Sequence, residues 1–307
     1  RPFPELKGPV ALGGGRDGRP PALSEYLGDP GAAPDERTGL AALSGEDEIS
    51  LVTSPDMHRV PGLSEALARS CGERGDRFAI LHTGPGLLPW KQYHPPFTSG
   101  YAALYYPWII VKKERGRAGV PIPPCGHIAG AFARVDRTLG VHHSPSGESL
   151  AGVLGLASPL AREEEDVLDR IGVNTIRAFP GGRFTVLGSG TLDPGGIRSI
   201  ATRRLLICLE QSICRGIGWA VHEPDTRAVE GLRASIREFL QRAWAGGKLA
   251  GKVEREAFFV RDGRDKDGAG RKTGPPVFEI GVAPEKRGEF VVFTITRESS
   301  RFTVQEV

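Results

Sequence analysis

The chain contains residues that could form a hydrolase site. Ser189 lies between two glycines in a turn, and His82 and Asp56 could act as the base and its orienting carboxylate. The full Gly-x-Ser-x-Gly elbow is missing, and nothing in the spacing brings the three residues together. We therefore expect no catalytic residues and no enzyme activity. A diverged α/β hydrolase-like enzyme is kept as an alternative interpretation.

Histidines and cysteines suggest a second kind of chemistry, metal binding. His142 and His143 precede Glu148, and His127 follows Cys125 at a gap that suits two ligands. Adjacent histidines on a strand point to opposite faces, however, and no His-Glu-x-x-His pattern supplies a general base. A surface loop with two histidines explains the pattern, so we expect no metal and no cofactor.

Two further clusters resemble binding loops for phosphate and calcium. The glycine-rich segment from Gly13 to Gly18 could cradle a phosphate, which would make the chain a nucleotide-binding module. It has neither of the standard glycine patterns of such loops, so we interpret it as a turn and keep nucleotide binding as a second alternative. The acidic run from Glu163 to Asp166 lacks the spacing of a calcium loop and is typical of the start of a helix.

The composition argues against partners that are recognised by charge alone. The 40 Lys and Arg residues nearly balance the 37 Asp and Glu residues, so we expect neither nucleic acid nor an anionic membrane as a partner. The longest apolar run, near residues 101–111, is too short to cross a membrane. The four cysteines form no Cys-x-x-Cys pair, and we expect reduced core thiols from a reducing cytoplasm.

The elements that would position any site begin with an α/β pattern. A strand over 49–53, a helix over 62–71 and a strand over 77–81 form a strand–helix–strand unit. Such alternation predicts a first domain with a mixed or parallel sheet and covering helices. Further elements are expected as one buried strand over 101–111, helices over 126–139 and 162–171, and strands over 174–179 and 184–187.

The second half predicts an α+β domain. Glycine, serine and proline cluster over 188–196, and this favours a domain boundary there, with domains over 1–190 and 191–307. Two amphipathic helices, over 197–219 and 226–245, precede the strands expected over 257–261, 277–282, 289–296 and 302–304. We expect residues 1–35 to be irregular and residues 261–276 to be a mobile surface loop.

Two features of this second domain could contact other proteins. Arg233, Arg237 and Arg242 give one side of the helix over 226–245 a positive charge, which is either a solvated face or a docking surface for an acidic protein. The last residues, 298–307, are too few to build a core but could add a strand to the open edge of another chain. Their alternative is a frayed tail.

Ordered strings along nearly the whole chain resemble the sheath proteins of contractile phage tails and phage-like injection systems. The second half carries the strings 203–213, 222–225, 239–240 with Trp244 and Gly251, and 281–284 leading into 289–293. The first half carries 38–40, 105–108, 121–124 with 126–130, and 172–177, which resemble the family's subtilisin-like domain.

The resemblance implies a structural subunit that polymerises as stacked hexameric rings around an inner tube. Contraction would then drive the tube through a target envelope. Its partners would be further copies of itself, the inner tube protein, and baseplate and terminator or cap proteins. Assembly would occur in the bacterial cytoplasm, and the product would be a phage tail or a tail-like particle.

The resemblance also assigns candidate contact residues. Strand exchange with neighbouring subunits would use the arm 298–307, with Phe302, Thr303, Val304 and Gln305 as candidates. The inner tube would contact Arg233, Arg237 and Arg242. Residues 187–192 lack the Trp and Arg often found at this turn of the family. No counterpart of the family's N-terminal arm or outer domain precedes Arg1, so we expect missing N-terminal sequence and reduced polymerisation.

Overall fold

The computed structural model describes residues 14–15, 18–86, 89–113, 119–222, 226–264, 276–298 and 302–306. Part of the glycine-rich segment 13–18 and most of the expected loop 261–276 lie outside these residues. The chain divides into two compact units, Arg1–Gly45 and Glu46–Val307, and each is described by itself.

The first unit contains short helices where the sequence predicts irregular structure. Helix α1 (Leu23–Leu27) is followed by α2 (Gly39–Ala42) and the 3₁₀ helix η1 (Leu43–Gly45). The expectation of an irregular segment up to residue 35 is therefore wrong at α1. The side chain of Glu25 accepts a hydrogen bond from the Ala22 amide at 2.7 Å, which satisfies a donor at the start of this helix.

The second unit begins with a five-stranded mixed sheet, in the order β1-β2-β3-β7-β8. Its strands are β1 (Leu51–Val52), β2 (Phe78–His82), β3 (Ala102–Tyr106), β7 (Val173–Phe179) and β8 (Arg183–Leu187). The first four are parallel, and β8 is antiparallel to β7. Every residue of β2 and β3 is buried, as expected for central strands covered on both faces. The predicted α/β class is confirmed.

Helices cover this sheet and bury its apolar side chains. They are η2 (Pro55–His58), α3 (Leu63–Arg74), α4 (Cys125–Thr138) and α5 (Arg162–Arg170). Ile128, Phe132 and Val135 recur at helical spacing on α4 and are buried. Ile128 and Phe132 pack in one cluster with Phe78 and Ile80 of β2. The helices predicted over 62–71, 126–139 and 162–171 are therefore confirmed.

The single buried strand predicted over 101–111 is wrong, because this segment forms two strands in two sheets. Pro107, which has no amide hydrogen, follows the end of β3, and Ile109–Lys112 then forms β4. Strand β4 lies between β5 (Gly119–Ile122) and β6 (Val153–Leu156) in an antiparallel sheet of three strands.

The C-terminal part is an antiparallel sheet of four strands with helices packed on one face. The helices are α6 (Ile200–Ile217), η3 (Gly218–His222), α7 (Thr226–Ala245) and α8 (Glu254–Ala257). The strands are β9 (Phe258–Asp262), β10 (Val277–Val282), β11 (Val291–Arg297) and β12 (Phe302–Glu306), in the order β12-β11-β10-β9. The predicted α+β character of this region is confirmed.

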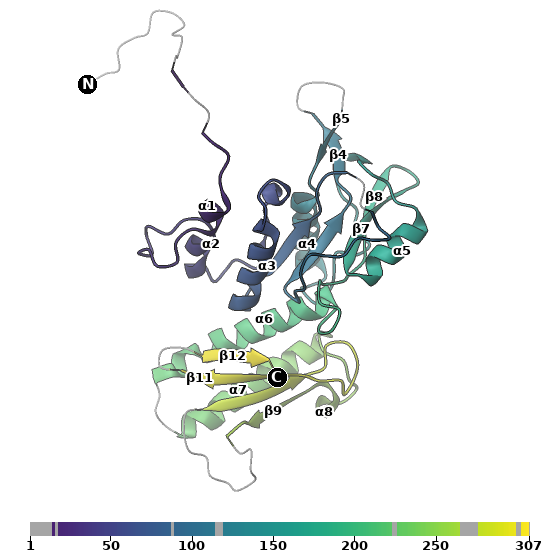
Figure 1. Ribbon diagram of the computed structural model, residues 1–307. Coiled ribbons are helices and arrows are strands. Elements are labelled where there is room, and N and C mark those ends of the chain that lie inside the picture. Colours follow the sequence, from purple (N-terminus) through teal and green to yellow (C-terminus); the bar gives the residue numbers. More distant parts are fainter. Residues whose placement is uncertain are drawn as a thin grey trace, which may run out of the picture. The chain divides into compact units, whose positions relative to one another are not determined.

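Helix α6 contributes to two hydrophobic clusters at once. Ile200 and Ile207 pack in the cluster of the five-stranded sheet, whereas Leu206, Leu209 and Ile213 pack in that of the C-terminal sheet. Figure 1 shows this helix running between the two sheets. The boundary predicted at 188–196 stays a prediction. Within the described residues, no helix combines the length and apolar character needed to span a membrane.

Candidate functional site

The C-terminal strand predicted to exchange between subunits is β12, which pairs with β11 of its own chain. The two strands are antiparallel, from Arg297 opposite Phe302 to Phe293 opposite Glu306. Phe302 and Val304 face the helices and join the core cluster, whereas Thr303 and Gln305 alternate onto the outer face. All four candidate residues of the arm therefore lie in β12. The role of these residues in strand exchange stays a prediction.

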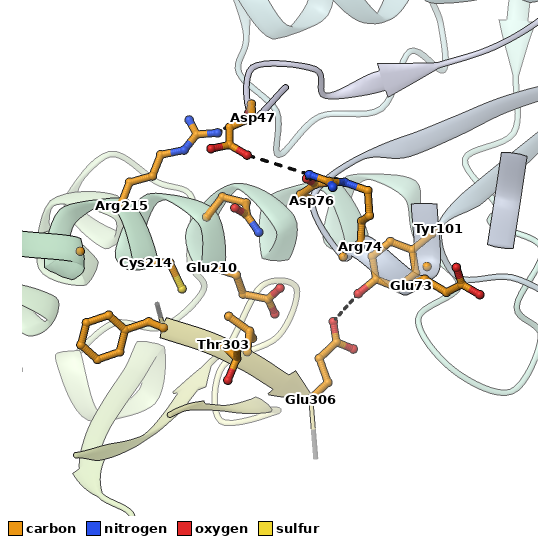
Figure 2. Close-up of a pocket in the computed structure, with 16 residues that line it drawn as sticks. Asp47, Glu73, Arg74, Asp76, Tyr101, Glu210, Cys214, Arg215, Thr303 and Glu306 are labelled. Carbon is orange, nitrogen blue, oxygen red and sulfur yellow. Dashed lines mark hydrogen bonds and ion pairs between the residues drawn. The ribbon is translucent and has the colours of Figure 1, made fainter. Parts of the chain in front are cut away.

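Strand β12 is the last strand of its sheet, and a pocket of about 790 Å³ lies beside it. Figure 2 shows Glu210 and Cys214 projecting from α6 toward β12, where Thr303 and Glu306 line the same pocket. Among the described residues, no strand pairs with the outer edge of β12. Backbone groups on such an edge can pair with a strand of another chain.

The end of β12 is bound by two side chains from elsewhere in the fold. Arg203 of α6 forms a hydrogen-bonded ion pair with the carboxylate of Glu306, and its second nitrogen donates to the other carboxylate oxygen at 3.1 Å. The hydroxyl of Tyr101 donates to Glu306 at 3.2 Å (Figure 2). The Arg203 guanidinium also lies 4.2 Å from the centroid of the Tyr101 ring. We call Tyr101 and Arg203 the anchor site.

Local structure explains why these two side chains lie together. Tyr101 comes directly before β3, and its carbonyl accepts the Ala79 amide of β2 at 2.8 Å. Helix α6 starts at a serine cap, where the Ser199 hydroxyl accepts the Thr202 amide at 3.2 Å. Arg203 therefore lies in the first turn of α6, at the junction of the central sheet and the C-terminal part.

The turn that leads into α6 is held by the buried side-chain amide of Asn174. Asn174 of β7 accepts the Gly190 amide and donates to the Gly190 carbonyl, both at 2.8 Å, and it also donates to the Leu104 carbonyl. Gly188 has φ +84°, and a Cβ there would lie 2.7 Å from the Asn174 side-chain oxygen. Glycine is thus required in this turn, and the start of α6 is held in place.

A buried carboxyl group lies near the anchor site. Glu210 is only 3% exposed, and its Oε1 has no hydrogen-bond partner in the described part of the chain. The pKa of Glu210 is raised to about 8, because burial and, second, the charge of Glu306 favour the protonated carboxyl more than Arg203 favours the carboxylate. Glu210 is therefore largely protonated at neutral pH.

A second arginine of α6 joins the two parts of this unit. Arg204 donates to both carboxylate oxygens of Asp136 in α4, each at 2.6 Å, and its guanidinium lies 4.9 Å from the centroid of the Phe132 ring. Arg204 is buried. This pair links α6 to α4 through a geometry that only arginine provides.

The three arginines predicted to contact an inner tube lie on the exposed side of α7, but they differ in their partners. Arg237 pairs with Glu254 at 2.6 Å, and Arg242 pairs with Glu238 of the same helix at 3.0 Å. Arg233 is exposed and forms no ion pair with any residue that the structure describes. The role of all three stays a prediction, and Arg233 has the guanidinium most available to another protein.

The candidates for catalysis and metal binding do not assemble into a site in the described residues. The His82 ring contacts the rings of His58 and Trp108, and its Nδ1 bonds the Thr83 carbonyl at 2.8 Å. Burial lowers the pKa of His82. No group of three metal-ligating side chains occurs in the described residues, and the rings of His142 and His143 contact each other.

Sequence reasoning missed the anchor site. The string 203–213 contains Arg203, Arg204 and Glu210 on a helix that is otherwise apolar, and ionisable residues on such a helix are buried only when they are paired or neutral. This signal could have indicated buried ion pairs. It could not have identified their partners, Tyr101, Asp136 and Glu306, which come from distant parts of the chain.

The chain matches the model of one protein family. The family model described as the phage tail sheath protein central domain matches residues 33–192, which is more than half of the 307 residues. No curated protein gives a significant match.

Solved structures from tail-like particles are similar to the chain. The helical sheath of the anti-feeding prophage in its contracted state has 29% identity and a TM-score of 0.68 over 82% of this chain. The sheath complex of the extracellular contractile injection system PVC, also contracted, has 26% identity and a TM-score of 0.66 over 83%. A chain of the anti-feeding prophage baseplate has 27% identity and a TM-score of 0.64 over 79%.

The chain spans 72% of the anti-feeding prophage sheath chain and 73% of the PVC sheath chain. It spans 66% of the baseplate chain, and this share is just under two thirds. The known structures are therefore longer than the part that aligns with this protein.

Proposed function

The chain belongs to the phage tail sheath protein family, and on this premise we propose that it polymerises as stacked hexameric rings around an inner tube. Contraction of the stack then drives the tube through a target envelope. The ion pairs of Arg203 with Glu306 and of Arg204 with Asp136 join different elements of the fold, which supports a mechanical role. The energy for contraction would be stored at assembly, in an extended packing that is less stable than the contracted one.

The observation that carries this proposal is the position of β12. It is a five-residue edge strand whose one partner among the described strands is β11, and its core contacts come from Phe302 and Val304. If β12 left the sheet, the edge of β11 would be open. The β12 strand of another copy could then pair with β11 in the same register. The arm 298–307 would thereby link neighbouring subunits by strand exchange.

The inner tube is proposed to bind the exposed side of α7. Arg233, Arg237 and Arg242 place positive charge there, and an acidic tube surface would complement it. Arg233 would contribute most, because Arg237 and Arg242 already pair with glutamates of their own chain.

The other partners follow from the particles to which the chain is similar. Those structures are described as sheath and baseplate assemblies, which supports self-association and contact with baseplate proteins. We propose a terminator or cap protein as a further partner, assembly in the bacterial cytoplasm, and a final place in a phage tail or tail-like particle.

Electron microscopy of the purified chain tests the proposal. In negative stain, the full chain should form rings or tubes with six-fold end views, and a variant that lacks residues after Arg297 should not. Monodisperse monomers from both samples, at concentrations well above those of the grids, would contradict polymerisation through the arm. Tubes from both samples would support a sheath and exclude the arm as the link.

A further inference from the structure

We propose that Glu210 is a proton-controlled release for the C-terminal strand. While Glu210 carries a proton, Glu306 stays bound to the anchor site, Tyr101 and Arg203. When Glu210 loses the proton, two carboxylates share one arginine, and β12 detaches from the sheet. This inference rests on the proposed function, since the same strand is the arm that would be exchanged between subunits.

The geometry makes the anchor site specific for one carboxylate. Arg203 uses both terminal nitrogens on Glu306, and the hydroxyl of Tyr101 bonds to both partners, at 3.0 Å to Arg203 and 3.2 Å to Glu306. The remaining donor, Nε of Arg203, is buried and has no partner in the described residues. Glu210 lies seven residues further along α6, on the same face of the helix as Arg203.

The surroundings contain too little positive charge for two carboxylates. The ionisable groups that act on Glu210 or are acted on by it are Arg203 and Cys214 of α6, Tyr101, and Glu306 of β12. The other ionisable residues that line the pocket are Asp47, Glu73, Arg74, Asp76 and Arg215. Of these, Arg74 already pairs with Asp76 at 2.6 Å. Arg215 donates to the backbone carbonyl of Asp47. Among the described residues, Arg203 is therefore the cation that is hydrogen bonded to Glu306, and its ion pair there is with a single carboxylate.

The direction of the pH effect follows from the change in surroundings. With β12 in place, burial and Glu306 keep the proton on Glu210 up to a pKa of about 8. When β12 leaves, Glu306 leaves with it and water enters the pocket, so the carboxyl returns toward its ordinary pKa. Glu210 therefore binds its proton less tightly in the detached state than in the attached state. A rise in pH from the ordinary pKa of the carboxyl to about 8 favours detachment.

Hydrogen exchange on the full chain tests this at a concentration at which microscopy shows no rings or tubes. Protection factors of the amides of β12 are measured at pH 6 and pH 9, after correction for the intrinsic exchange rate. We expect protection in β12 to fall by about tenfold or more at pH 9, since each unit of pKa difference changes the equilibrium tenfold. Amides of β10, in the centre of the same sheet, should keep their protection, which separates local detachment from global unfolding.

Three variants identify the group responsible. E210Q mimics the protonated carboxyl, so its β12 amides should be equally protected at both pH values. E306Q removes the charge that Arg203 binds, so protection should be low at both. E289Q changes an exposed carboxylate that pairs with Lys286 and should behave like the unaltered chain.

Two results would overturn the inference. Equal protection of β12 at pH 6 and pH 9 in the unaltered chain would exclude a release in this range. A pH effect of the same size in E210Q would assign it to another group. Either result leaves the proposed function standing, because polymerisation is read by microscopy at constant pH; loss of polymerisation with an intact pH effect would contradict only the proposed function.

Discussion

The ionisable residues of α6 show how a structural protein uses buried charge. Arg203, Arg204 and Glu210 are each no more than 5% exposed. The two arginines pair with carboxylates from different elements, and Glu210 avoids the cost of a buried charge by holding a proton. Each arginine is therefore tied to the position of a partner that lies far away in the sequence.

At this scale, we predict that Arg204→Ala destabilises the chain strongly. The change removes both hydrogen bonds to Asp136 and the contact with Phe132, and it leaves a partly buried carboxylate without its cation. Because the Asp136 side chain is 23% exposed, we expect a loss of about 2–3 kcal/mol in the free energy of unfolding, below the value for a fully buried pair. Urea denaturation measures it.

The matched control is Arg69→Ala, which breaks an exposed ion pair with Glu65 whose nitrogen–oxygen distance is 2.7 Å, against 2.6 Å for Arg204 and Asp136. Surface pairs of this kind contribute at most about 1 kcal/mol, so the control should change little. Equal losses in the two variants would contradict a special role for the link between α4 and α6.

At the scale of elements, helix α7 is held by its apolar stripe. Leu232, Ile236 and Leu240 recur four residues apart and are at most 1% exposed, whereas arginines and glutamates occupy the other side. This stripe packs on the inner face of the C-terminal sheet, together with Phe278, Ile280 and Phe293. The helix is thus positioned by packing, and its charged side is exposed.

We predict that Leu240→Ala lowers the free energy of unfolding by about 3 kcal/mol, because it removes a fully buried side chain and leaves a cavity. Thermal unfolding followed by circular dichroism measures the change. Gln241→Ala, at the next and exposed position of the helix, should change the same quantity by less than about 0.5 kcal/mol. A similar cost for both would mean that α7 does not pack through this stripe.

At the scale of the whole molecule, the residues from Glu46 onward form one compact unit with two hydrophobic clusters that share α6. The anchor site adds a polar connection, since it joins Tyr101 at the central sheet to the last strand of the chain. A change in the position of β12 would therefore alter the hydrogen bonds that Arg203 and Glu306 make with Tyr101 at the central sheet. This coupling is what a subunit needs if its arm and its body are to move together.

We predict that Arg233→Glu weakens binding to the inner tube protein of the same particle by about tenfold without loss of stability. Arg233 is exposed and has no ion pair in the described part of the chain, so the free energy of unfolding should stay within about 0.5 kcal/mol. Co-sedimentation with assembled tubes measures the binding. Arg137→Glu reverses another exposed arginine, at the end of α4, and should leave tube binding unchanged.

The sequence by itself determined the local elements and the class of the fold. Apolar periodicity predicted α3, α4, α6 and α7, the acidic first turn predicted α5, and runs of β-branched and aromatic residues predicted the strands of the five-stranded and the C-terminal sheets. Strands β5 and β6 were not predicted. The order of short strings also indicated the family, which the family comparison confirms. These features are local, because side-chain spacing along a helix or strand decides which face is apolar.

Only the tertiary structure decided where the segment after Tyr101 divides, what binds Arg203 and Arg204, and that Glu210 is buried. Ile109 could have continued the strand before it, but its register partners, Ile122 of β5 and Leu156 of β6, belong to another sheet. The anchor site joins residues that are 102 and 103 positions apart in sequence. Pairings of this kind depend on how whole elements pack. Local spacing cannot indicate which of the chain's distant carboxylates will pair with a given arginine.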